Sequence, residues 1–572
     1  MKKHPLHIIK SAIVEDLKKH HAFLGALAED ALVYPPDTKF GDIALPCFAY
    51  AQSAGKNPAE LARAIAESGV VASEWVSAVN AAGPYVNFVL KGDALARVLF
   101  AALKKPALFG TNDFGKGERV MIEYPSPNTH KEFHIGHVRN VCLGVALTHL
   151  YEASGFKMAQ VDYTNDLGSH VAKCLWALMK FHKGEKPPRG REARWLGAVY
   201  AEGAQKLEAY PEYAPEVSEV LQKLESRDKV VHTLWKKTRA WSIKGMNGYL
   251  KELGARYKRE FFENEVKDEG KKIVAELLKK GIAKKSQGAV IIDMEAQGFG
   301  IMLLLKSDGT GLYSTSDLAL ARKKFKLFKI DRSINITDVR QSLYFKQLFH
   351  ALALSGFTQK MTHIGYEFVR LPEGAMASRT GRVILYEDMR DEIIEAAAEE
   401  TKKRHPEWSA RKIADTAHAL ALAGLKFGML KYDPNKVIVF DKKEALSFEG
   451  FTGPYLLYTF ARMNSLLKKT RSVARGLVDA ALLADAHEKQ LAIHAARLPE
   501  IVQSATENNN PSELAQYAYK LCQLFGGFYE HCPVLRAPNE DVGRARIALV
   551  QAAQSVLEQS LKLLDIPLIQ EM

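Results

Sequence analysis

The chain has 572 residues, 47% apolar and 25% charged, a composition typical of a globular protein with large buried cores. No run approaches the ~20 uninterrupted apolar residues that a membrane-spanning helix needs. The N-terminal stretch is interrupted by charges at Glu15, Asp16, Lys18 and Lys19, so it predicts an amphipathic helix rather than a signal peptide, and we expect a cytoplasmic protein without a membrane partner. The net charge of +13 fits either a polyanionic partner such as nucleic acid or a solvated basic surface.

The cysteine pattern argues against disulfides and against a cysteine-based zinc site. Five cysteines are scattered along the chain, and no CxxC pair occurs. An odd, dispersed set of this kind predicts no disulfide framework. We therefore expect no metal ion held tightly by protein ligands.

Residues 1–112 predict a small α/β domain that ends in a turn-rich segment. Its predicted elements are helices at 5–30 and 56–68 and strands at 40–45 and 83–90. Asn57 as N-cap and Pro58 in the first turn predict the start of the second helix.

Residues 113–405 predict a doubly wound parallel sheet. A strand at 119–124, a helix at 134–155 and a second strand at 157–163 follow one another, as in nucleotide-binding sheets. A charged helical insertion occupies about 178–260. Further strand-like runs lie at 289–294, 301–306, 333–338 and 361–368. Residues 406–572 are helical in pattern and predict an all-α bundle.

The segment EYPSPNTHKEFHIGHVRN (123–140) places two histidines around a glycine where a strand gives way to a helix. A helix N-terminus offers unpaired N–H groups and partial positive charge to a phosphate. His134 and His137 could donate hydrogen bonds to phosphate oxygens, Gly136 could let a purine approach, and Lys131 could reach the same anion. Taken alone, the two histidines could also merely cap the helix.

This segment resembles the ATP-binding signature of class I aminoacyl-tRNA synthetases, and specifically of the arginyl-tRNA synthetase family. Similar stretches follow in the family's order at 40–45, 83–90, 163–173, 311–321, 447–463, 526–535 and the C-terminal LLDIPLIQEM. The resemblance implies a Rossmann-like catalytic domain of the HIGH type, an N-terminal tRNA-elbow-binding domain and a C-terminal anticodon-binding domain. It implies ATP-dependent activation of L-arginine and transfer to tRNA(Arg). ATP would bring Mg²⁺ as a companion of the substrate, no covalent nucleophile would be needed, and most relatives act as monomers.

A guanidinium group offers only donors, so arginine recognition requires carboxylates. The resemblance assigns Glu123, Asp317 and Tyr313 to the guanidinium and Asn128 and Gln341 to the backbone end of the amino acid. We expect Glu123 and Asp317 each at the carboxyl end of a strand. Considered in isolation, Glu123 could form a strand-end salt bridge and Asp317 could be a helix N-cap. The motif context favours contact with the ligand.

Two departures from the family pattern stand out. The loop EGAMASRTGRV (373–383) lacks both lysines of the KMSKS type that hold pyrophosphate; Met376 and Ser378 match, and Arg379 or Arg382 could supply charge. Tyr344 occupies a position where the family often has histidine.

Several residues are candidate tRNA contacts. Tyr455, Tyr458 and Arg462 form one helical stripe that could stack on anticodon bases or pack as core. The resemblance places Met572 near the anticodon. Tyr85 and Asn87 share a strand face. They could bind an elbow-loop base or pack as an ordinary cross-strand pair, and the sequence favours neither alternative.

Two other functions are alternatives to arginine activation. A cysteinyl or glutamyl synthetase is disfavoured because the sequence has no cysteine cluster and its candidate pocket is acidic. A tRNA-binding protein that has lost catalysis would fit the degenerate loop but not the intact HIGH segment.

Overall fold

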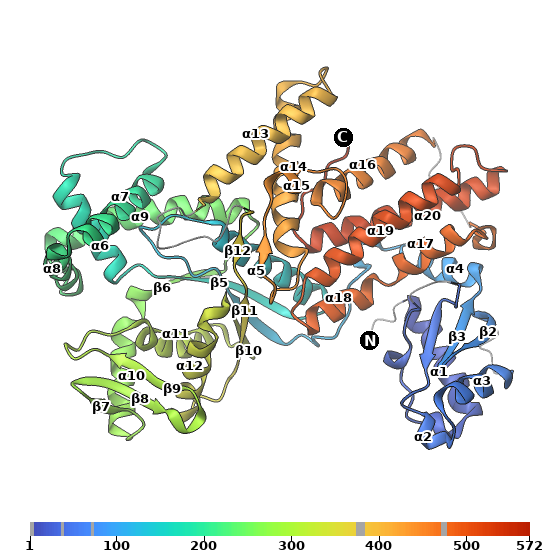
Figure 1. The fold of residues 1–572 in the computed structure, drawn as a ribbon, viewed down its shortest axis with the longest axis horizontal. Helices are drawn as coiled ribbons and strands as arrows, with labels where there is room; N and C mark the ends of the chain where they lie inside the picture. The colour runs from blue at the N-terminus through green and yellow to red at the C-terminus, as the bar shows by residue number, and fades with distance from the viewer. Residues whose placement is uncertain (1–4, 36–38, 70–73, 373–383, 471–477) are drawn as a thin grey trace. The chain divides into compact units, whose positions relative to one another are not determined.

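The computed structural model describes residues 5–35, 39–69, 74–372, 384–470 and 478–572, and it divides into two compact units. Unit 1 contains residues 1–114, 448–508 and 513–572, and unit 2 contains residues 115–447 and 509–512 (Figure 1). None of the described helices is long and apolar enough to cross a membrane.

Unit 2 is built on a five-stranded parallel sheet, as the sequence predicts. Its strands are β4 (Arg119–Glu123), β5 (Lys157–Thr164), β6 (Arg259–Phe262), β10 (Arg332–Asp338) and β11 (Lys360–Tyr366). The spatial order is β11-β10-β4-β5-β6, so the chain winds outward from β4 in both directions. Ligands of such sheets bind beyond the carboxyl ends of the strands where the winding reverses, which here is between β4 and β10.

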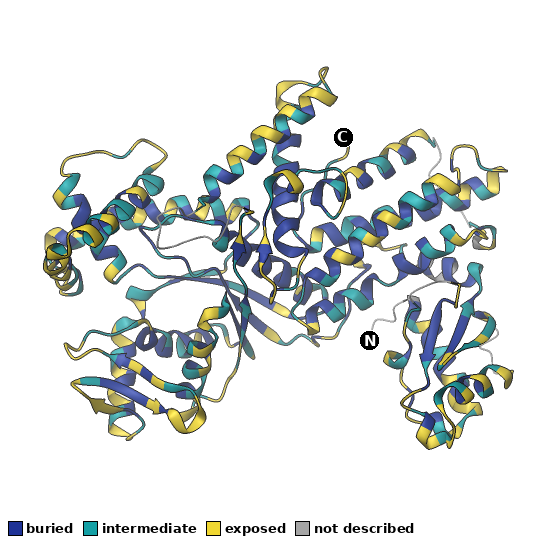
Figure 2. Ribbon diagram, in the orientation of Figure 1, coloured by how far each residue is buried: buried dark blue, intermediate teal, exposed yellow. Residues whose placement is uncertain are grey.

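Helices cover the sheet and bury it. Helix α5 (Ile135–Ala153) packs on β4, β5 and β10. Helices α10 (Lys267–Lys279), α11 (Tyr313–Phe328) and α12 (Ser342–Leu354) share one apolar core with the strands. The burial colouring in Figure 2 shows the central strands of this sheet as mainly buried.

The predicted helical insertion is present and has its own core. It consists of α6 (Ser169–Phe181), α7 (Glu192–Ala209), α8 (Ala214–Glu225) and α9 (Lys229–Glu252). The insertion ends before residue 259, where β6 returns the chain to the parallel sheet.

Two of the strand-like runs lie outside the parallel sheet. β7 (Lys284–Ser286), β8 (Ala289–Met294) and β9 (Gly300–Leu305) form a separate antiparallel sheet. Their alternation places Ile292 and Leu304 in the core and leaves Ile301 exposed. An antiparallel sheet with one solvated face shows this pattern, whereas parallel strands covered on both faces do not.

Helices α13 (Tyr386–Arg404) and α14 (Ala410–Leu430) pack on each other, and α14 also packs on α5. Both belong to unit 2, whose first segment ends at residue 447.

Unit 1 combines the N-terminal α/β domain with the C-terminal helices. Its antiparallel sheet has the order β1-β3-β2, formed by β1 (Ile43–Pro46), β2 (Val76–Ala82) and β3 (Tyr85–Leu90). The helix predicted at 5–30 is shorter in the structure, where α1 spans Pro5–His20. Two 3₁₀ turns, Ala22–Leu24 and Glu29–Ala31, follow it. Helix α3 (Pro58–Glu67) starts as predicted, because Asn57 and Glu60 form a capping box.

The remaining elements of unit 1 are mainly helices. They are α2 (Ala51–Ala54), α4 (Gly92–Ala102), α16 (Gly453–Lys469), α17 (Ala486–Ala496), α18 (Leu498–Glu507), α19 (Ser512–His531) and α20 (Glu540–Leu563). Helix α4 packs against α17 and α20, so the N-terminal domain and the bundle share one unit.

Candidate active site

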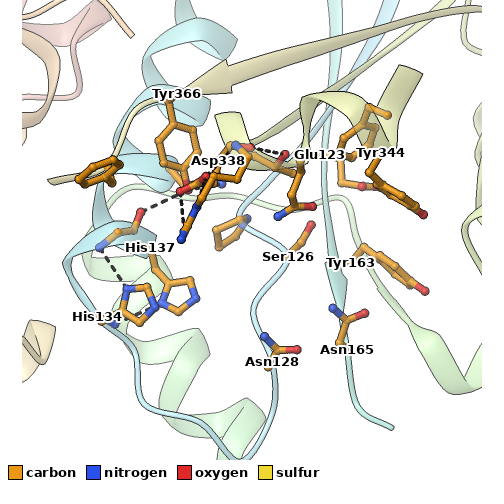
Figure 3. Close-up of a pocket in the computed structure, with 18 of the residues that line it drawn as sticks. Glu123, Ser126, Asn128, His134, His137, Tyr163, Asn165, Asp338, Tyr344 and Tyr366 are labelled. Carbon is orange, nitrogen blue, oxygen red and sulfur yellow. Dashed lines mark hydrogen bonds and ion pairs between the residues drawn. The ribbon is translucent and has the colours of Figure 1, made fainter. Parts of the chain in front are cut away.

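A cavity of about 820 Å³ lies in unit 2 beyond the carboxyl ends of β4, β5 and β10 (Figure 3). It brings together most of the sequence-predicted site residues, namely Glu123, Asn128, His134, Gly136, His137, Tyr313, Asp317 and Gln341. Sequence reasoning did not single out several others that line it, including Ser126, Asn165, Asp338, Arg340 and Arg370. The cavity is therefore the candidate active site.

The two histidines form one stacked pair at the start of α5. His134 is the N-cap, and its Nδ1 accepts a hydrogen bond from the Gly136 N–H at 3.1 Å. The His137 Nδ1 accepts from the His134 N–H at 3.2 Å, and the ring centroids are 3.8 Å apart. An Nδ1 that accepts a backbone hydrogen bond carries no proton, so in each neutral ring the proton lies on Nε2. The pair therefore caps the helix and keeps two Nε2–H donors.

Burial keeps both imidazoles neutral. Desolvation, with the nearby Lys131 charge, lowers the pKa of His134 to about 4. The same causes, together with His134, hold the pKa of His137 well below its usual value. Neutral Nε2–H groups of this kind can donate to the charge that develops on a phosphate without themselves titrating near pH 7.

The backbone of this helix start is less available to an anion than the sequence suggested. The Ile135 N–H donates to the Ile384 carbonyl, the Gly136 N–H to His134 Nδ1, and the His137 N–H to the His134 carbonyl. The expectation of free N–H groups in this first turn is therefore wrong. Gly136 has a further role, because a Cβ there would lie 3.0 Å from the His134 ring.

The loop before these histidines is fixed by its neighbours. Thr129 N–H donates to the Asn165 carbonyl, and Asn165 N–H donates to Pro127, which holds Asn128 beside Asn165 at the cavity. His130, fully buried, contacts Thr238 through Nε2 at 2.8 Å. The insertion helix α9 thus anchors the loop.

Tyr313 and Asp317 lie one turn apart on α11, so both face the cavity. The expected position of Asp317 at a strand end of the parallel sheet is wrong: it sits in a helix that follows antiparallel β9. The hydroxyls of Ser314 and Thr315 donate to the carbonyls of Leu303 and Leu304 and tie the helix start to β9.

Asp317 is a carboxylate with one oxygen unused. Its Oδ2 accepts from the Tyr344 hydroxyl, whereas its buried Oδ1 has no hydrogen-bond partner within the described part of the chain. Desolvation raises the pKa of Asp317 to about 7, and the Glu123 charge adds to this rise, whereas the hydroxyls of Tyr344 and Tyr163 and the Lys324 charge lower it. A buried hydrogen-bond acceptor without a partner destabilises the folded protein. This indicates that a ligand with a donor group binds Oδ1 of Asp317.

Glu123 differs from Asp317, because its charge is already compensated. Its Oε2 accepts from Lys324 Nζ at 2.9 Å and its Oε1 from Asn335 Nδ2 at 2.7 Å, and this ion pair is almost fully buried. The strand-end salt bridge that the sequence left open is therefore present. Each oxygen keeps a second lone pair, so Glu123 can still accept from a ligand, but it adds little net charge.

Other predicted residues fall outside this cavity. Lys131 does not line it, and its ammonium lies 5.2 Å from the ring centroid of Tyr200 on α7. Met376, Ser378, Arg379 and Arg382 lie outside the described residues.

The two candidate tRNA contacts in the N-terminal domain, Tyr85 and Asn87, differ in their exposure to solvent. Tyr85 is exposed and packs edge-to-face against the exposed Phe48, with ring centroids 5.9 Å apart. Asn87 is only 2% exposed and lies on the central strand opposite Ala44 and Asn80. The cross-strand reading therefore holds for Asn87, and Phe48 is the second exposed aromatic that sequence reasoning missed.

The stripe on α16 is mostly packed. Tyr455 contacts Tyr519, with centroids 5.5 Å apart, and Arg462 stacks over Tyr529 at 4.1 Å. Tyr458 alone of the three is exposed. The C-terminal tail runs along the same helix, where Asn464 Nδ2 donates to the Gln570 carbonyl, and Met572 remains partly exposed.

Comparison with known proteins agrees with this geometry. The family model for the class I (R) tRNA synthetase catalytic domain matches residues 100–441, the DALR anticodon-binding domain matches 456–572, and the arginyl-tRNA synthetase N-terminal domain matches 7–90. The chain is 35% identical to an arginine–tRNA ligase of Bdellovibrio bacteriovorus, over 94% of this chain and 93% of the relative, and 33% identical to one of Treponema pallidum, over 94% of each. A solved arginyl-tRNA synthetase of Thermus thermophilus superposes with a TM-score of 0.82 at 26% identity over all of both chains. The chain belongs to the arginyl-tRNA synthetase family of class I aminoacyl-tRNA synthetases.

Proposed function

We propose that this protein activates L-arginine with ATP and transfers it to the 3′-terminal adenosine of tRNA(Arg), releasing AMP and pyrophosphate. The observation that carries this proposal is Asp317, a buried carboxylate whose Oδ1 has no hydrogen-bond partner among the described residues and which lines the same cavity as the stacked histidine pair. The free oxygen suits a guanidinium, and the Nε2–H groups suit a phosphate.

The geometry supports a division of roles within the cavity. Asp317 and Tyr313 bind the guanidinium, Glu123 contributes a second acceptor, and Asn128 and Gln341 hold the backbone end of arginine. The carboxylate of arginine then attacks the α-phosphorus of ATP, forming the mixed anhydride and displacing pyrophosphate.

Catalysis rests on positioning and charge stabilisation, without a covalent enzyme intermediate. His134 and His137 donate to the phosphate oxygens as charge builds on them, and Gly136 leaves room for the His134 ring. Lys131 is near enough to depress the pKa of both histidines, which supports a role in attracting the triphosphate. Met376, Ser378 and Arg379, which lie outside the described residues, are proposed as further ATP contacts, and Mg²⁺ accompanies ATP as part of the substrate.

We propose residues 1–112, 113–405 and 406–572 as elbow-binding, catalytic and anticodon-binding domains. Tyr85 and Tyr458 are the exposed aromatic candidates for RNA stacking, whereas Asn87, Tyr455 and Arg462 have internal partners, and Met572 lies beside α16. All five cysteines are buried free thiols, which supports a reducing, cytoplasmic location. The protein is proposed to act as a monomer, which light scattering can test.

The test is amino-acid-dependent exchange of pyrophosphate into ATP, with each of the twenty amino acids and with or without tRNA. Exchange with arginine alone, and only when tRNA is present, is the expected result. Exchange with another amino acid would refute the specificity. No exchange combined with tight tRNA binding would indicate a tRNA-binding protein without catalysis.

Arginine binding should weaken below neutral pH. The Asp317 carboxyl, with a pKa near 7 in the free protein, becomes protonated as pH falls, and a neutral acid loses the charge that attracts a guanidinium. The arginine KM should therefore rise about tenfold from pH 8 to pH 6. The kcat should change much less, because both histidines stay neutral over that range. Exchange kinetics at fixed saturating ATP measure this, and a flat KM would contradict it.

A further inference from the structure

Tyr344 contacts both predicted guanidinium ligands on α11, Asp317 and Tyr313. It lies in the first turn of α12, and its hydroxyl donates to Asp317 Oδ2. Its ring meets the ring of Tyr313 at a centroid distance of 4.8 Å and an interplanar angle of 66°. Tyr344 also lines the cavity, and Figure 3 shows it beside Tyr163.

We propose that Tyr344 is a specificity-determining positioning residue, which orients the Asp317 carboxylate and the Tyr313 ring for arginine. This inference rests on the proposed function. Because the Tyr344 hydroxyl occupies Oδ2, Oδ1 is the oxygen that contacts the substrate. The same hydrogen bond fixes the rotation of the carboxylate about the Cβ–Cγ bond of Asp317. A hydrogen bond to a charged acceptor is among the stronger ones, so it can hold this orientation.

A phenol also suits the charge balance of the pocket. The charged and titratable groups that face it are Asp317 on α11, Tyr163 on β5 and Tyr313. A phenol donates one hydrogen bond and stays neutral, whereas an imidazole at the same place could take up a second proton. A cation there would repel the incoming guanidinium. It would also neutralise the Asp317 carboxylate, just as Lys324 neutralises Glu123.

Phenylalanine and histidine at position 344 provide the discriminating variants. Tyr344→Phe keeps the ring packing and removes only the O–H, so the arginine KM should rise about tenfold, while kcat and the ATP KM change less than about threefold. Tyr344→His should restore binding at pH 8, where imidazole is neutral and can donate. At pH 6 its arginine KM should exceed that of the wild type.

Tyr257→Phe is the matched control, because the Tyr257 hydroxyl is buried, has no hydrogen-bond partner among the described residues and lies outside the cavity. Its kinetics should equal those of the wild type. Adding Tyr344→Phe to Asp317→Asn should raise KM little further, because the oriented carboxylate is already gone.

Distinct results would overturn distinct claims. A wild-type protein inactive with arginine defeats the proposed function. An active wild type with Tyr344→Phe indistinguishable from Tyr257→Phe defeats the positioning role alone. A Tyr344→Phe variant in which the arginine KM, the ATP KM and the melting temperature all change together, or whose effect adds fully to Asp317→Asn, assigns Tyr344 a structural role.

Discussion

Asp317→Asn should raise the arginine KM at least about a hundredfold, a loss of about 2.7 kcal/mol. The substitution keeps the shape of the side chain and removes the carboxylate charge, which forms no ion pair with any described residue. It can also turn an N–H towards the guanidinium, which has only donors. Removing one partner of a desolvated, hydrogen-bonded charge pair costs about 2–5 kcal/mol. Arginine-dependent pyrophosphate exchange with tRNA present measures the change.

Glu123→Gln provides the comparison, because it alters an acid whose charge is already balanced. We expect a rise in the arginine KM of at least about tenfold and a smaller one than for Asp317→Asn. It should also lower the free energy of unfolding, since it leaves the Lys324 ammonium buried without an anion. Unchanged arginine KM in Asp317→Asn would remove Asp317 from the pocket. A larger KM effect at Glu123 would reverse the assigned ranking.

His137→Ala should lower kcat for arginine activation by about 10²–10³-fold while the arginine KM changes less than about threefold. The lost Nε2–H donor acts on charge that develops only as the α-phosphorus is attacked, and removing one such donor typically has an effect of this size. Single-turnover formation of the adenylate measures the rate, and equilibrium dialysis measures arginine binding.

His137→Asn separates catalysis from helix capping. An asparagine amide oxygen can accept from the His134 N–H, as His137 Nδ1 does, but it places no donor where Nε2 lies. We expect this variant to melt like the wild type and to be as slow as His137→Ala. Wild-type rates in His137→Asn, or parallel losses of rate and arginine binding in His137→Ala, would mean that the residue is structural.

The sequence predicted the signature loop and the first strands of the parallel sheet well, because these depend on local pattern. An apolar run, a turn and a capped helix occupy contiguous residues, so β4, the signature loop and α5 can be recognised without knowledge of their neighbours. The same holds for α3 with its Asn57 cap. By contrast, β2 was missed, since VSAVNAA is rich in small residues.

Errors arose where an assignment depended on distant parts of the chain. The runs at 289–294 and 301–306 are strands as predicted, yet pairing between strands decides their sheet, and β8 pairs with β9 rather than with β10. Asp317 was expected at the end of a strand, but it lies on helix α11, which follows β9 in the chain. Asn87 alternates correctly along its strand, but the neighbouring strands bury it.

The sequence by itself determined the family signature, the acid at position 317 and the tyrosine at position 344. Only the tertiary structure decided which carboxylate remains uncompensated, because Lys324 is 201 residues away from Glu123 and Tyr344 is 27 residues from Asp317. Charge and hydrogen-bond partners depend on distances of about 3 Å in space, and such distances between remote residues exist only after the chain has folded.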